Sequence, residues 1–162
     1  MLGWPFFSKK PDPVIRPLES RWFADAARLH GRFFARAWSV SDFEQLVRDR
    51  QVVADGAFDG PGKTCFGFAI SRFVAPEAEL LSIAVEPRFQ GRGVGQRLLS
   101  AHFYRLAVQG VQEVFLEVEQ GNEPALRLYE QFGFAKVGER AGYYPKQDGT
   151  RATALVMRAV LS

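Results

Sequence analysis

A buried strand, a glycine-rich turn and the first turns of a helix can be read in one segment, Leu80-Leu81-Ser82-Ile83-Ala84-Val85-Glu86-Pro87-Arg88-Phe89-Gln90-Gly91-Arg92-Gly93-Val94-Gly95-Gln96-Arg97-Leu98-Leu99. The run Leu80–Val85 is short, apolar and partly β-branched, which is typical of a buried strand. Pro87 has no N–H for a strand ladder, so the strand is predicted to end near it. Apolar residues then recur at helical spacing from Leu98 to Ala107, which predicts a long helix.

The turn between this strand and this helix has glycines at alternate positions, Gly91, Gly93 and Gly95. Glycine lets the chain turn tightly and lets its amides approach a ligand closely. A glycine turn that leads into a helix N-terminus also collects unpaired N–H groups and the positive end of the helix dipole, which suits a phosphate or pyrophosphate. The pattern matches neither the P-loop nor the dinucleotide-binding fingerprint. Taken alone, it leaves a plain turn and an anion site equally open.

The segment Gln90-Gly91-Arg92-Gly93-Val94-Gly95 resembles the Q/R-x-x-G-x-G/A signature of the GNAT acetyltransferases. The resemblance implies that the loop amides hold the pyrophosphate of acetyl-coenzyme A (acetyl-CoA), and that the preceding strand lies beside its thioester and pantetheine arm. Gly91 departs from the family pattern, because a basic residue is common there, and Arg92 is then the nearest cation to the phosphates. The cofactor-binding residues implied are Ile83, Ala84, Val85, Gly91, Arg92, Gly93, Val94, Gly95, Gln96 and Asn122.

A second block of resemblance is Leu116-Glu117-Val118-x-x-x-Asn122-x-x-Ala125-x-x-Leu128-Tyr129-x-x-x-Gly133-Phe134. It is similar to the strand and the Asn-capped helix that complete the GNAT cofactor site. Within the superfamily, the chain is most similar to the bacterial ribosomal-protein N-terminal alanine acetyltransferase family. That family carries Leu-Glu-Val, Leu-Tyr-Glu and a final Tyr-Tyr-Pro-x-x-Asp-Gly, which stands here as Tyr143-Tyr144-Pro145-Lys146-Gln147-Asp148-Gly149. The resemblance covers residues 79–162 well and residues 14–74 loosely.

The composition of the whole chain is that of one globular domain of 162 residues, 47% hydrophobic and 24% charged. Residues 1–13 are aromatic and proline-rich, which predicts a poorly ordered leader before an N-acetyltransferase domain over residues 14–162; contact of this leader with a membrane surface or a partner is the alternative. The net charge of +3 is too small to indicate nucleic-acid binding. The lone Cys65 excludes a disulfide framework and suits a reducing cytosol. No segment of the sequence resembles a targeting signal or a membrane span, so the protein is expected to be a cytoplasmic monomer or weak dimer.

The order of elements and the resemblance together indicate an α/β (α+β) GNAT fold. Its mixed, mostly antiparallel sheet of about seven strands is expected to be flanked by about four helices. Ser41-x-x-Glu44 is a capping-box pattern that predicts the start of the second helix. The predicted strands cover residues 14–18, 51–58, 64–74, 80–85, 114–118, 134–140 and 152–160, with a loop over 143–149. The predicted helices cover residues 20–34, 41–50, the segment from the glycine turn to 109, and 122–133.

Acetyl transfer to an amine needs a base for the ammonium and an acid for the leaving thiolate. Glu117 is on the strand face opposite its apolar neighbours, so it lines either solvent or a cleft. The resemblance makes Glu117 the general base, acting directly or through a water, with burial expected to raise its pKa. Tyr129 is a helix core tyrosine by pattern, and the resemblance makes it the general acid. Asn122 is predicted to cap the last helix and to contact the cofactor.

Three aromatic residues, Trp38, Tyr143 and Tyr144, are candidates for contacts with the acceptor. Trp38 and Phe34 flank the connection between the first two helices, which lies over the acceptor site in the GNAT superfamily; packing in the core is the slightly favoured alternative. Tyr143 and Tyr144 either line an acceptor groove or pack the last hairpin, and the groove is favoured for one of them. His30 is interpreted as a structural helix histidine.

These features predict direct acetyl transfer from acetyl-CoA to the N-terminal α-amine of a protein with an Ala-type or Ser-type terminus. A ribosomal protein is the acceptor that the resemblance suggests. The chemistry requires neither a covalent acyl-enzyme nor a metal. An acetyltransferase of a small amine or antibiotic is the first alternative, and a CoA-binding sensor without turnover is the second.

Overall fold

The computed structural model describes residues 13–60 and 64–161, so the predicted leader lies outside the described residues except for Pro13. Its centre is a seven-stranded sheet with the strand order β1-β2-β3-β4-β5-β7-β6. Among the described strands, β4 and β5 alone run parallel, which confirms the mixed, mostly antiparallel sheet. The strands are β1 (Val14–Pro17), β2 (Val52–Phe58), β3 (Cys65–Val74), β4 (Glu77–Val85), β5 (Glu113–Glu119), β6 (Ala135–Pro145) and β7 (Arg151–Val160).

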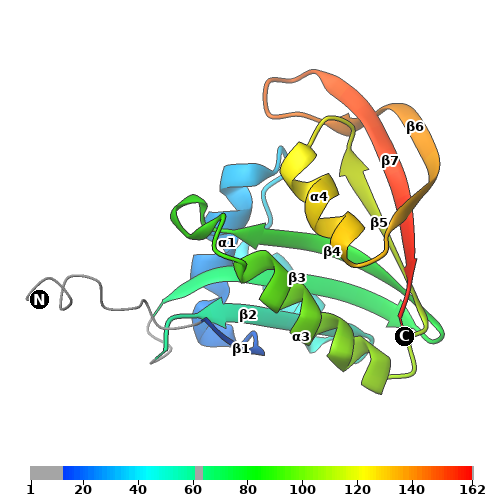
Figure 1. Cartoon of the computed structure of the whole chain (residues 1–162). Coiled ribbons are helices and arrows are strands. Elements are labelled where there is room, and N and C mark those ends of the chain that lie inside the picture. Colours follow the sequence, from blue (N-terminus) through cyan, green and yellow to red (C-terminus); the bar gives the residue numbers. More distant parts are fainter. Residues whose placement is uncertain (1–12, 61–63, 162) are drawn as a thin grey trace, which may run out of the picture.

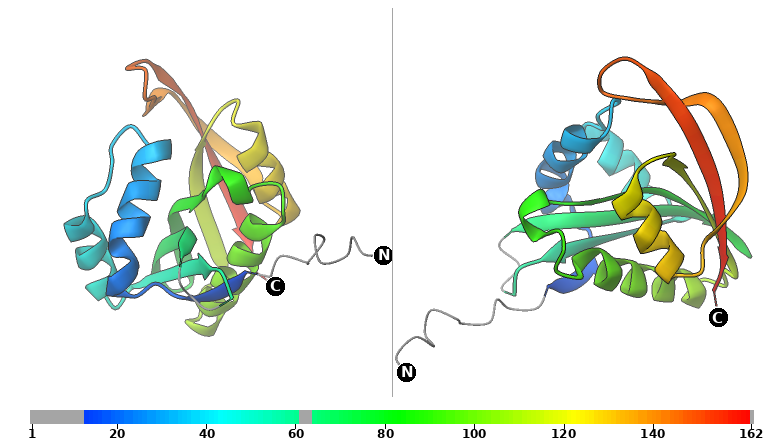
Figure 2. Two further views of the ribbon diagram at one scale, coloured as in Figure 1. Left: turned by 90° about the vertical axis from the view of Figure 1, so that its left-hand side faces the viewer. Right: turned by 45° about the horizontal axis from the view of Figure 1, so that its top comes forward.

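Two helices lie on each face of the sheet (Figures 1 and 2). One face carries α1 (Phe23–Phe33) and α2 (Val40–Arg48), and the other carries α3 (Val94–Val108) and α4 (Glu123–Gln131). Short 3-10 turns, η2 (Ser20–Trp22) and η3 (Pro87–Phe89), precede α1 and the glycine-rich loop. No helix within the described ranges is long and apolar enough to cross a membrane.

Each face of the sheet has its own hydrophobic core. On the α3/α4 face, Leu106 of α3 and Tyr129 of α4 pack in one cluster with Leu116 of β5. On the α1/α2 face, Phe23 of α1 and Phe43 of α2 belong to a second cluster, which also includes residues of β2, β3 and β4. Because alternate residues of a strand point to opposite faces, these two clusters decide which way each side chain of the sheet points.

The parallel strands β4 and β5 part halfway along their length. Their pairing covers four positions and ends at Leu80↔Leu116, although β4 continues to Val85 and β5 to Glu119. Beyond that point, the edge of β4 that faced β5 has no ladder partner among the described strands. The sheet therefore opens between the carboxyl ends of two neighbouring strands.

An extra residue in β4 lies directly beside this opening. Leu80 pairs with Ser71 of β3 and Ser82 pairs with Ile70, so Leu81 is left without a partner. Such a bulge bends its strand and increases the local twist. The bulge therefore accounts for the departure of β4 from β5 at this position.

The second helix begins earlier than the sequence pattern predicted. Ser39 is its N-cap: the Ser39 hydroxyl accepts a hydrogen bond from the Asp42 amide at 3.1 Å, and the Asp42 carboxylate accepts one from the Ser39 amide at 2.8 Å. The prediction of Ser41 and Glu44 as the capping pair is therefore wrong. A reciprocal box needs both bonds, and the start at Ser39 carries Phe43 into the core, where it is fully buried.

Strand β6 is longer than predicted. It pairs with β7 at both ends, from Ala135↔Arg158 to Pro145↔Arg151, with an irregularity between Arg140 and Tyr144. Tyr144 pairs with Ala152, so the two tyrosines at 143 and 144 lie on the strand and not in a loop. The ladder continues across the irregularity, which the sequence pattern did not indicate.

Candidate active site

The glycine-rich loop joins the end of β4 to α3 and presents backbone amides. Gly91 and Gly93 have φ angles of 76° and 75°, in the left-handed region that favours glycine, and Gly93 is the N-cap of α3. The Arg97 amide donates to the Gly93 carbonyl at 3.0 Å and begins the helix ladder. The amides of residues 94–96 precede that ladder, at the positive end of the helix dipole. This is the arrangement that an anion requires.

Contacts on both sides hold this loop in place. Gln90 Nε2 donates to the carbonyl of Val85 at 2.9 Å, which ties the loop to the end of β4. The Phe89 ring stacks on Phe66 with 4.1 Å between centroids. The guanidinium of Arg92 lies 5.7 Å from the Phe89 centroid, so this cation stands at the loop.

The start of α3 also packs closely against α4. A Cβ atom on Gly95 would lie 3.2 Å from a methyl group of Leu128, so glycine permits the close approach of the two helices. The predicted cap of α4 is confirmed, because the Asn122 side chain accepts a hydrogen bond from the Ala125 amide at 3.3 Å. Since α3 follows β4 and α4 follows β5, both helix N-termini lie where the two strands part.

The three predicted cofactor residues of β4 lie along its free edge. Ile83 and Val85 are partly buried against the α3/α4 core, whereas Ala84 is buried on the α1/α2 face. Backbone groups that leave a ladder need another partner. A ligand that enters the opening can therefore hydrogen-bond to this edge.

Tyr129 belongs to α4, whose N-terminus borders the opening, and its side chain is 6% exposed in the α3/α4 core. Burial raises its pKa well above the usual value of 10, and the neighbouring Tyr144 raises it further. The phenol therefore keeps its proton at neutral pH. A protonated hydroxyl is the state that a general acid needs.

Glu117 has a different environment from the one predicted. Its side chain is 34% exposed, and its Oε1 lies 3.2 Å from Nη1 of Arg140. The prediction that the Glu117 carboxylate is buried is therefore wrong. The buried neighbours Leu116 and Val118 point to the α3/α4 face, so Glu117 points to the opposite face. Arg140 of β6 reaches it across β7.

The two tyrosines of β6 have different surroundings. Tyr144 is half-buried, and its pKa is raised by burial and then by the carboxylates of Glu119 and Glu117. Because Tyr144 also acts on Tyr129, it is within electrostatic reach of both predicted catalytic residues. Tyr143 is 47% exposed, and the Arg140 guanidinium lies 4.0 Å from its ring centroid.

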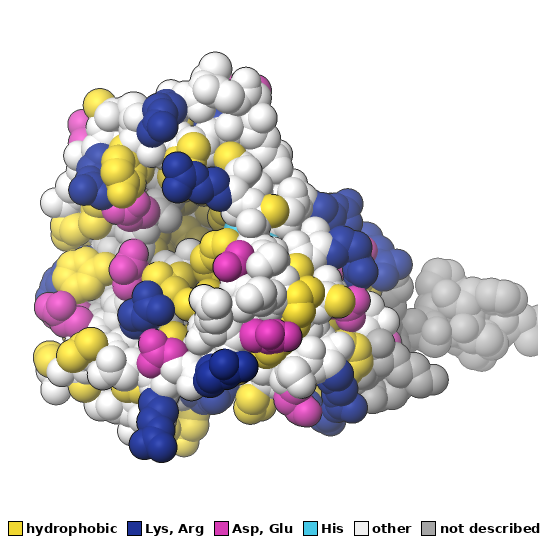
Figure 3. Space-filling view, turned by 180° about the vertical axis from the view of Figure 1, so that it is seen from behind, with side chains coloured by type: hydrophobic (Ala, Val, Ile, Leu, Met, Phe, Trp, Pro, Cys, Tyr) yellow, Lys and Arg dark blue, Asp and Glu magenta, His cyan; other side chains and the backbone are white. Residues whose placement is uncertain are grey.

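The tip of the β6–β7 hairpin extends towards α1 (Figure 2). Gln147 Nε2 donates to the carbonyl of Arg32 at 3.1 Å, and Lys146 pairs with Glu119 at 3.3 Å. The hairpin therefore bounds one side of the α1/α2 face of the opening. In the space-filling view from behind, hydrophobic side chains line a hollow that basic and acidic side chains surround (Figure 3).

Trp38 lies in an aromatic cluster at the start of α2. Its ring stacks on His30 at 4.3 Å, and its amide donates to Nδ1 of His30 at 3.1 Å. Phe34 stacks on the same imidazole at 4.4 Å. Burial lowers the pKa of His30 to about 4, against the weaker opposing effect of Asp42. The neutral, hydrogen-bonded imidazole has the structural role predicted for it.

Three polar residues at the opening escaped the sequence reasoning: Arg140, Lys146 and Ser82. Arg140 and Lys146 pair with Glu117 and Glu119, but only the β5-β7-β6 strand order brings these partners together. Local spacing contains no signal for such pairs. Ser82 belongs to the predicted strand, where a polar residue in an apolar run was the available signal.

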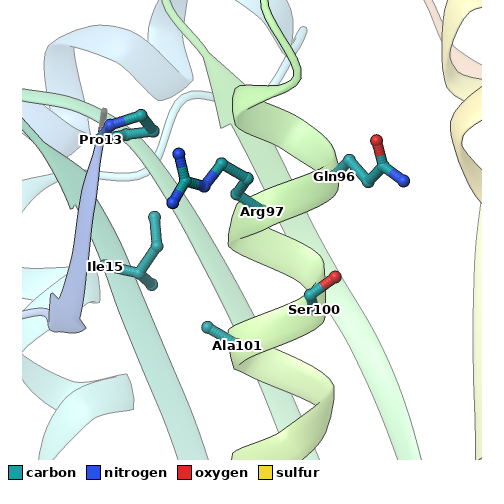
Figure 4. A pocket seen from close by; sticks show the side chains of 6 residues that line it. All are labelled: Pro13, Ile15, Gln96, Arg97, Ser100 and Ala101. Atoms are coloured by element: carbon teal, nitrogen blue, oxygen red, sulfur yellow. The ribbon is translucent and has the colours of Figure 1, made fainter. Parts of the chain in front are cut away.

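A separate hollow of about 500 Å³ lies between α3 and β1. Figure 4 shows Arg97 directed towards Pro13 and Ile15, whereas Gln96 points away from them. Gln96 nevertheless lines this hollow, so its predicted contact with the cofactor stays a prediction. Within the described ranges, no group of three or more His, Cys, Asp or Glu side chains is arranged to hold a metal ion.

Sequence comparisons find relatives along most of the chain. The sequence model of the Acetyltransferase (GNAT) family matches residues 16–134. The [ribosomal protein bS18]-alanine N-acetyltransferase of Escherichia coli is 34% identical over 149 residues, which cover 92% of this chain and 98% of that protein. The enzyme of the same name from Haemophilus influenzae is 45% identical over 95 residues. That match spans 59% of this chain and 64% of the relative's length.

Structural comparisons agree with these matches. The crystal structure of the ribosomal-protein-S18-alanine N-acetyltransferase from Escherichia coli has a TM-score of 0.81 and 32% identity, covering 93% of this chain and 94% of that one. A phosphinothricin acetyltransferase from Sinorhizobium meliloti, at 16% identity, has a TM-score of 0.80 and covers 93% of this chain and 89% of that one, which shows a shared fold alone. By the family match and the full-length relative, the chain belongs to the acetyltransferase (GNAT) family.

Proposed function

We propose that this protein transfers an acetyl group from acetyl-CoA to the N-terminal α-amine of a protein, with a ribosomal protein as the acceptor. The observation that carries the proposal is the parting of β4 and β5 between an amide-rich loop and the side chains of Glu117 and Tyr129. The similarity to alanine N-acetyltransferases of ribosomal proteins supports the choice of acceptor. Such an acceptor also favours a cytoplasmic protein.

The loop and the free edge of β4 fit the two ends of the acetyl-CoA arm. The amides of residues 91–96 and the guanidinium of Arg92 would hold the pyrophosphate. The backbone of residues 83–85 would hydrogen-bond to the pantetheine arm and donate to the thioester oxygen, where negative charge develops. Asn122, at the start of α4, borders the same opening.

Glu117 is the base in this proposal. It accepts a proton from the acceptor ammonium, directly or through a water, and the neutral nitrogen then attacks the thioester carbonyl. In the free protein, the Arg140 guanidinium donates a hydrogen bond to the carboxylate of Glu117.

Tyr129 is the acid. When the tetrahedral intermediate collapses, the carbon–sulfur bond breaks and the phenol donates its proton to the thiolate of CoA. The raised pKa of Tyr129 ensures that the proton is present at neutral pH. The products are the N-acetylated acceptor and free CoA.

The acceptor would approach from the α1/α2 face, along the hairpin. Tyr144, with its neighbouring carboxylates, suits a terminal ammonium close to the reacting centre. The exposed ring of Tyr143 and the half-buried ring of Trp38 are proposed to contact the following residues of the peptide.

The experiment that tests this function measures CoA release from acetyl-CoA with a panel of acceptors. The panel contains peptides that begin with Ala, Ser, Met and Gly, together with polyamines and aminoglycosides. A peptide with a blocked N-terminus and a free lysine is the matched control. Turnover of Ala or Ser termini that disappears on blocking is expected. Turnover of small amines alone would contradict the proposal of a protein N-terminus as the acceptor. No turnover of any acceptor would contradict the proposed enzymatic activity.

A further inference from the structure

Ser82 has an unusual position for a polar side chain. It is 5% exposed, and its hydroxyl is the one buried side-chain oxygen or nitrogen without a hydrogen-bond partner in the described part of the chain. A buried donor or acceptor without a partner costs about 1–3 kcal/mol. A hydrogen-bond partner for this hydroxyl would therefore have to come from outside the protein chain.

The register of the sheet gives the direction in which this hydroxyl points. Ser82 pairs with Ile70 of β3, and cross-strand partners point to the same face. Ile70 belongs to the cluster on the α1/α2 face, as does Ala84, two residues beyond Ser82 on the same strand. Ser82 therefore faces α1 and α2, on the side from which the acceptor is proposed to approach.

The same face carries Glu117 on the neighbouring strand. The last pair that joins β4 to β5 is Leu80↔Leu116, so Glu117 directly follows the pairing on one strand and Ser82 follows it by two residues on the other. The bulge at Leu81 lies between the pairing and Ser82. The hydroxyl and the carboxylate thus flank the narrow end of the opening.

We propose that Ser82 is a positioning residue for proton transfer: its hydroxyl holds the water through which Glu117 deprotonates the acceptor. This inference rests on the proposed function. The acceptor ammonium gives a proton to the water while the water gives one to the carboxylate, so the water is regenerated and the amine becomes neutral. Because Arg140 binds Glu117 from the β6 side, a fixed water on the β4 side connects the carboxylate to the acceptor.

A second buried serine provides a matched control. Ser71 of β3 is 0% exposed, and its hydroxyl lies 2.7 Å from Nε2 of His102 on the α3/α4 face. Ser71→Ala removes a satisfied hydroxyl away from the opening, whereas Ser82→Ala removes an unsatisfied one inside it. Ser71→Ala is therefore expected to lower stability, and Ser82→Ala is expected to leave stability unchanged or raised.

The test compares two peptide acceptors that differ only in the terminal group. The first peptide begins with an ordinary α-amine, which is protonated at neutral pH. The second begins with an aminooxy group, which is largely uncharged at neutral pH and needs no base before attack. For Ser82→Ala, we expect kcat with the amine to fall about 10-fold and kcat with the aminooxy peptide to stay within about twofold of wild type. Ser71→Ala is expected to treat the two acceptors alike.

The outcomes separate the two proposals. Equal loss for both acceptors in Ser82→Ala, or no loss for either, overturns the role of Ser82 and leaves the function standing. Ser82→Ala could instead lower stability and leave the preference between the two acceptors unchanged. The Ser82 hydroxyl would then have a purely structural role, and its proposed role in proton transfer would be contradicted. If the wild-type protein turns over neither acceptor, the proposed function fails, and the inference fails with it.

Discussion

Two clusters of polar side chains lie on opposite faces of the same sheet and differ in access to solvent. On the α3/α4 face, His102 of α3 is bonded at 2.7 Å to Asp55 through Nδ1 and at 2.7 Å to Ser71 through Nε2. These residues reproduce the order of bonds in a Ser-His-Asp catalytic triad, yet they are 1% exposed or less. On the α1/α2 face, Glu117 and Arg140 form a half-exposed pair at the opening.

The comparison shows that a triad-like order of hydrogen bonds is not enough to identify an active site. A nucleophile must reach its substrate, and Ser71 is closed off by the core around it. The buried cluster instead fastens α3 to the sheet, since His102 and Arg105 of α3 both bind Asp55 of β2. The N-terminus of that helix carries the glycine-rich loop, so the cluster supports the site without belonging to it.

Glu117→Gln should have the largest effect, and it should be on activity alone. Removal of a general base is expected to lower kcat/KM for a peptide acceptor by about 10²–10⁴-fold. Because the pair with Arg140 is half-exposed, the free energy of unfolding should change by less than about 1 kcal/mol. Steady-state CoA release and urea denaturation measure the two quantities. Activity within a few-fold of wild type would remove Glu117 from the chemistry.

Asp55→Ala should show the reverse pattern. The carboxylate is buried against His102 and Arg105, and removal of one partner from a buried charged network costs about 3–5 kcal/mol. Urea denaturation at pH 7 is expected to show a loss of that size. Where the variant remains folded at low temperature, turnover with saturating acetyl-CoA should persist, because Asp55 does not touch the opening. A stable variant without activity would show that the buried cluster belongs to the chemistry after all.

Sequence reasoning succeeded where the determinants are close together in the chain. The strand, glycine turn and helix of residues 80–99 depend on local spacing, and the Asn122 cap depends on its own helix. Two overlapping capping patterns could not be separated locally, because the choice of Ser39 over Ser41 depends on which start buries Phe43. Alternation along the strand predicted that Glu117 lies on the face opposite its apolar neighbours, but it could not identify its partner Arg140, which belongs to another strand.

The buried cluster was equally out of reach. Asp55 and His102 are separated by 47 positions, and only the packing of α3 on β2 joins them. The available signal was an aspartate within the otherwise apolar strand β2, where six of seven residues are buried. A charged residue in such a run indicates a buried partner, although it does not say which one.

The two histidines of the chain extend the comparison to acid. His102 has a carboxylate partner, whereas His30 is stacked among aromatic rings, and burial lowers its pKa to about 4 from 6.5. As pH falls below 6.5, the unfolded state binds the proton first, so stability is lost progressively until about pH 4. His30 should contribute a loss of about 2 kcal/mol between pH 7 and pH 5.

His30→Gln tests this contribution without introducing a charge. The variant should be less stable than wild type at pH 7, because the aromatic stacking is lost. The difference between its unfolding free energies at pH 7 and pH 5 should be smaller than that of wild type by about 2 kcal/mol. An identical pH dependence in the two proteins would assign the acid sensitivity to other groups.

The smallest effects come from the same substitution at both clusters. Arg105→Ala removes a guanidinium from a carboxylate that is 1% exposed, whereas Arg140→Ala removes one from a carboxylate that is 34% exposed. We expect the free energy of unfolding to fall by about 1–3 kcal/mol for Arg105→Ala and by less than about 1 kcal/mol for Arg140→Ala. Raising the salt concentration should reduce the second difference more than the first, because exposed pairs are screened more strongly than pairs with a buried partner. Equal losses with equal salt dependence would mean that burial does not distinguish the two clusters, and the contrast between a supporting network and an open site would then have to rest on activity alone.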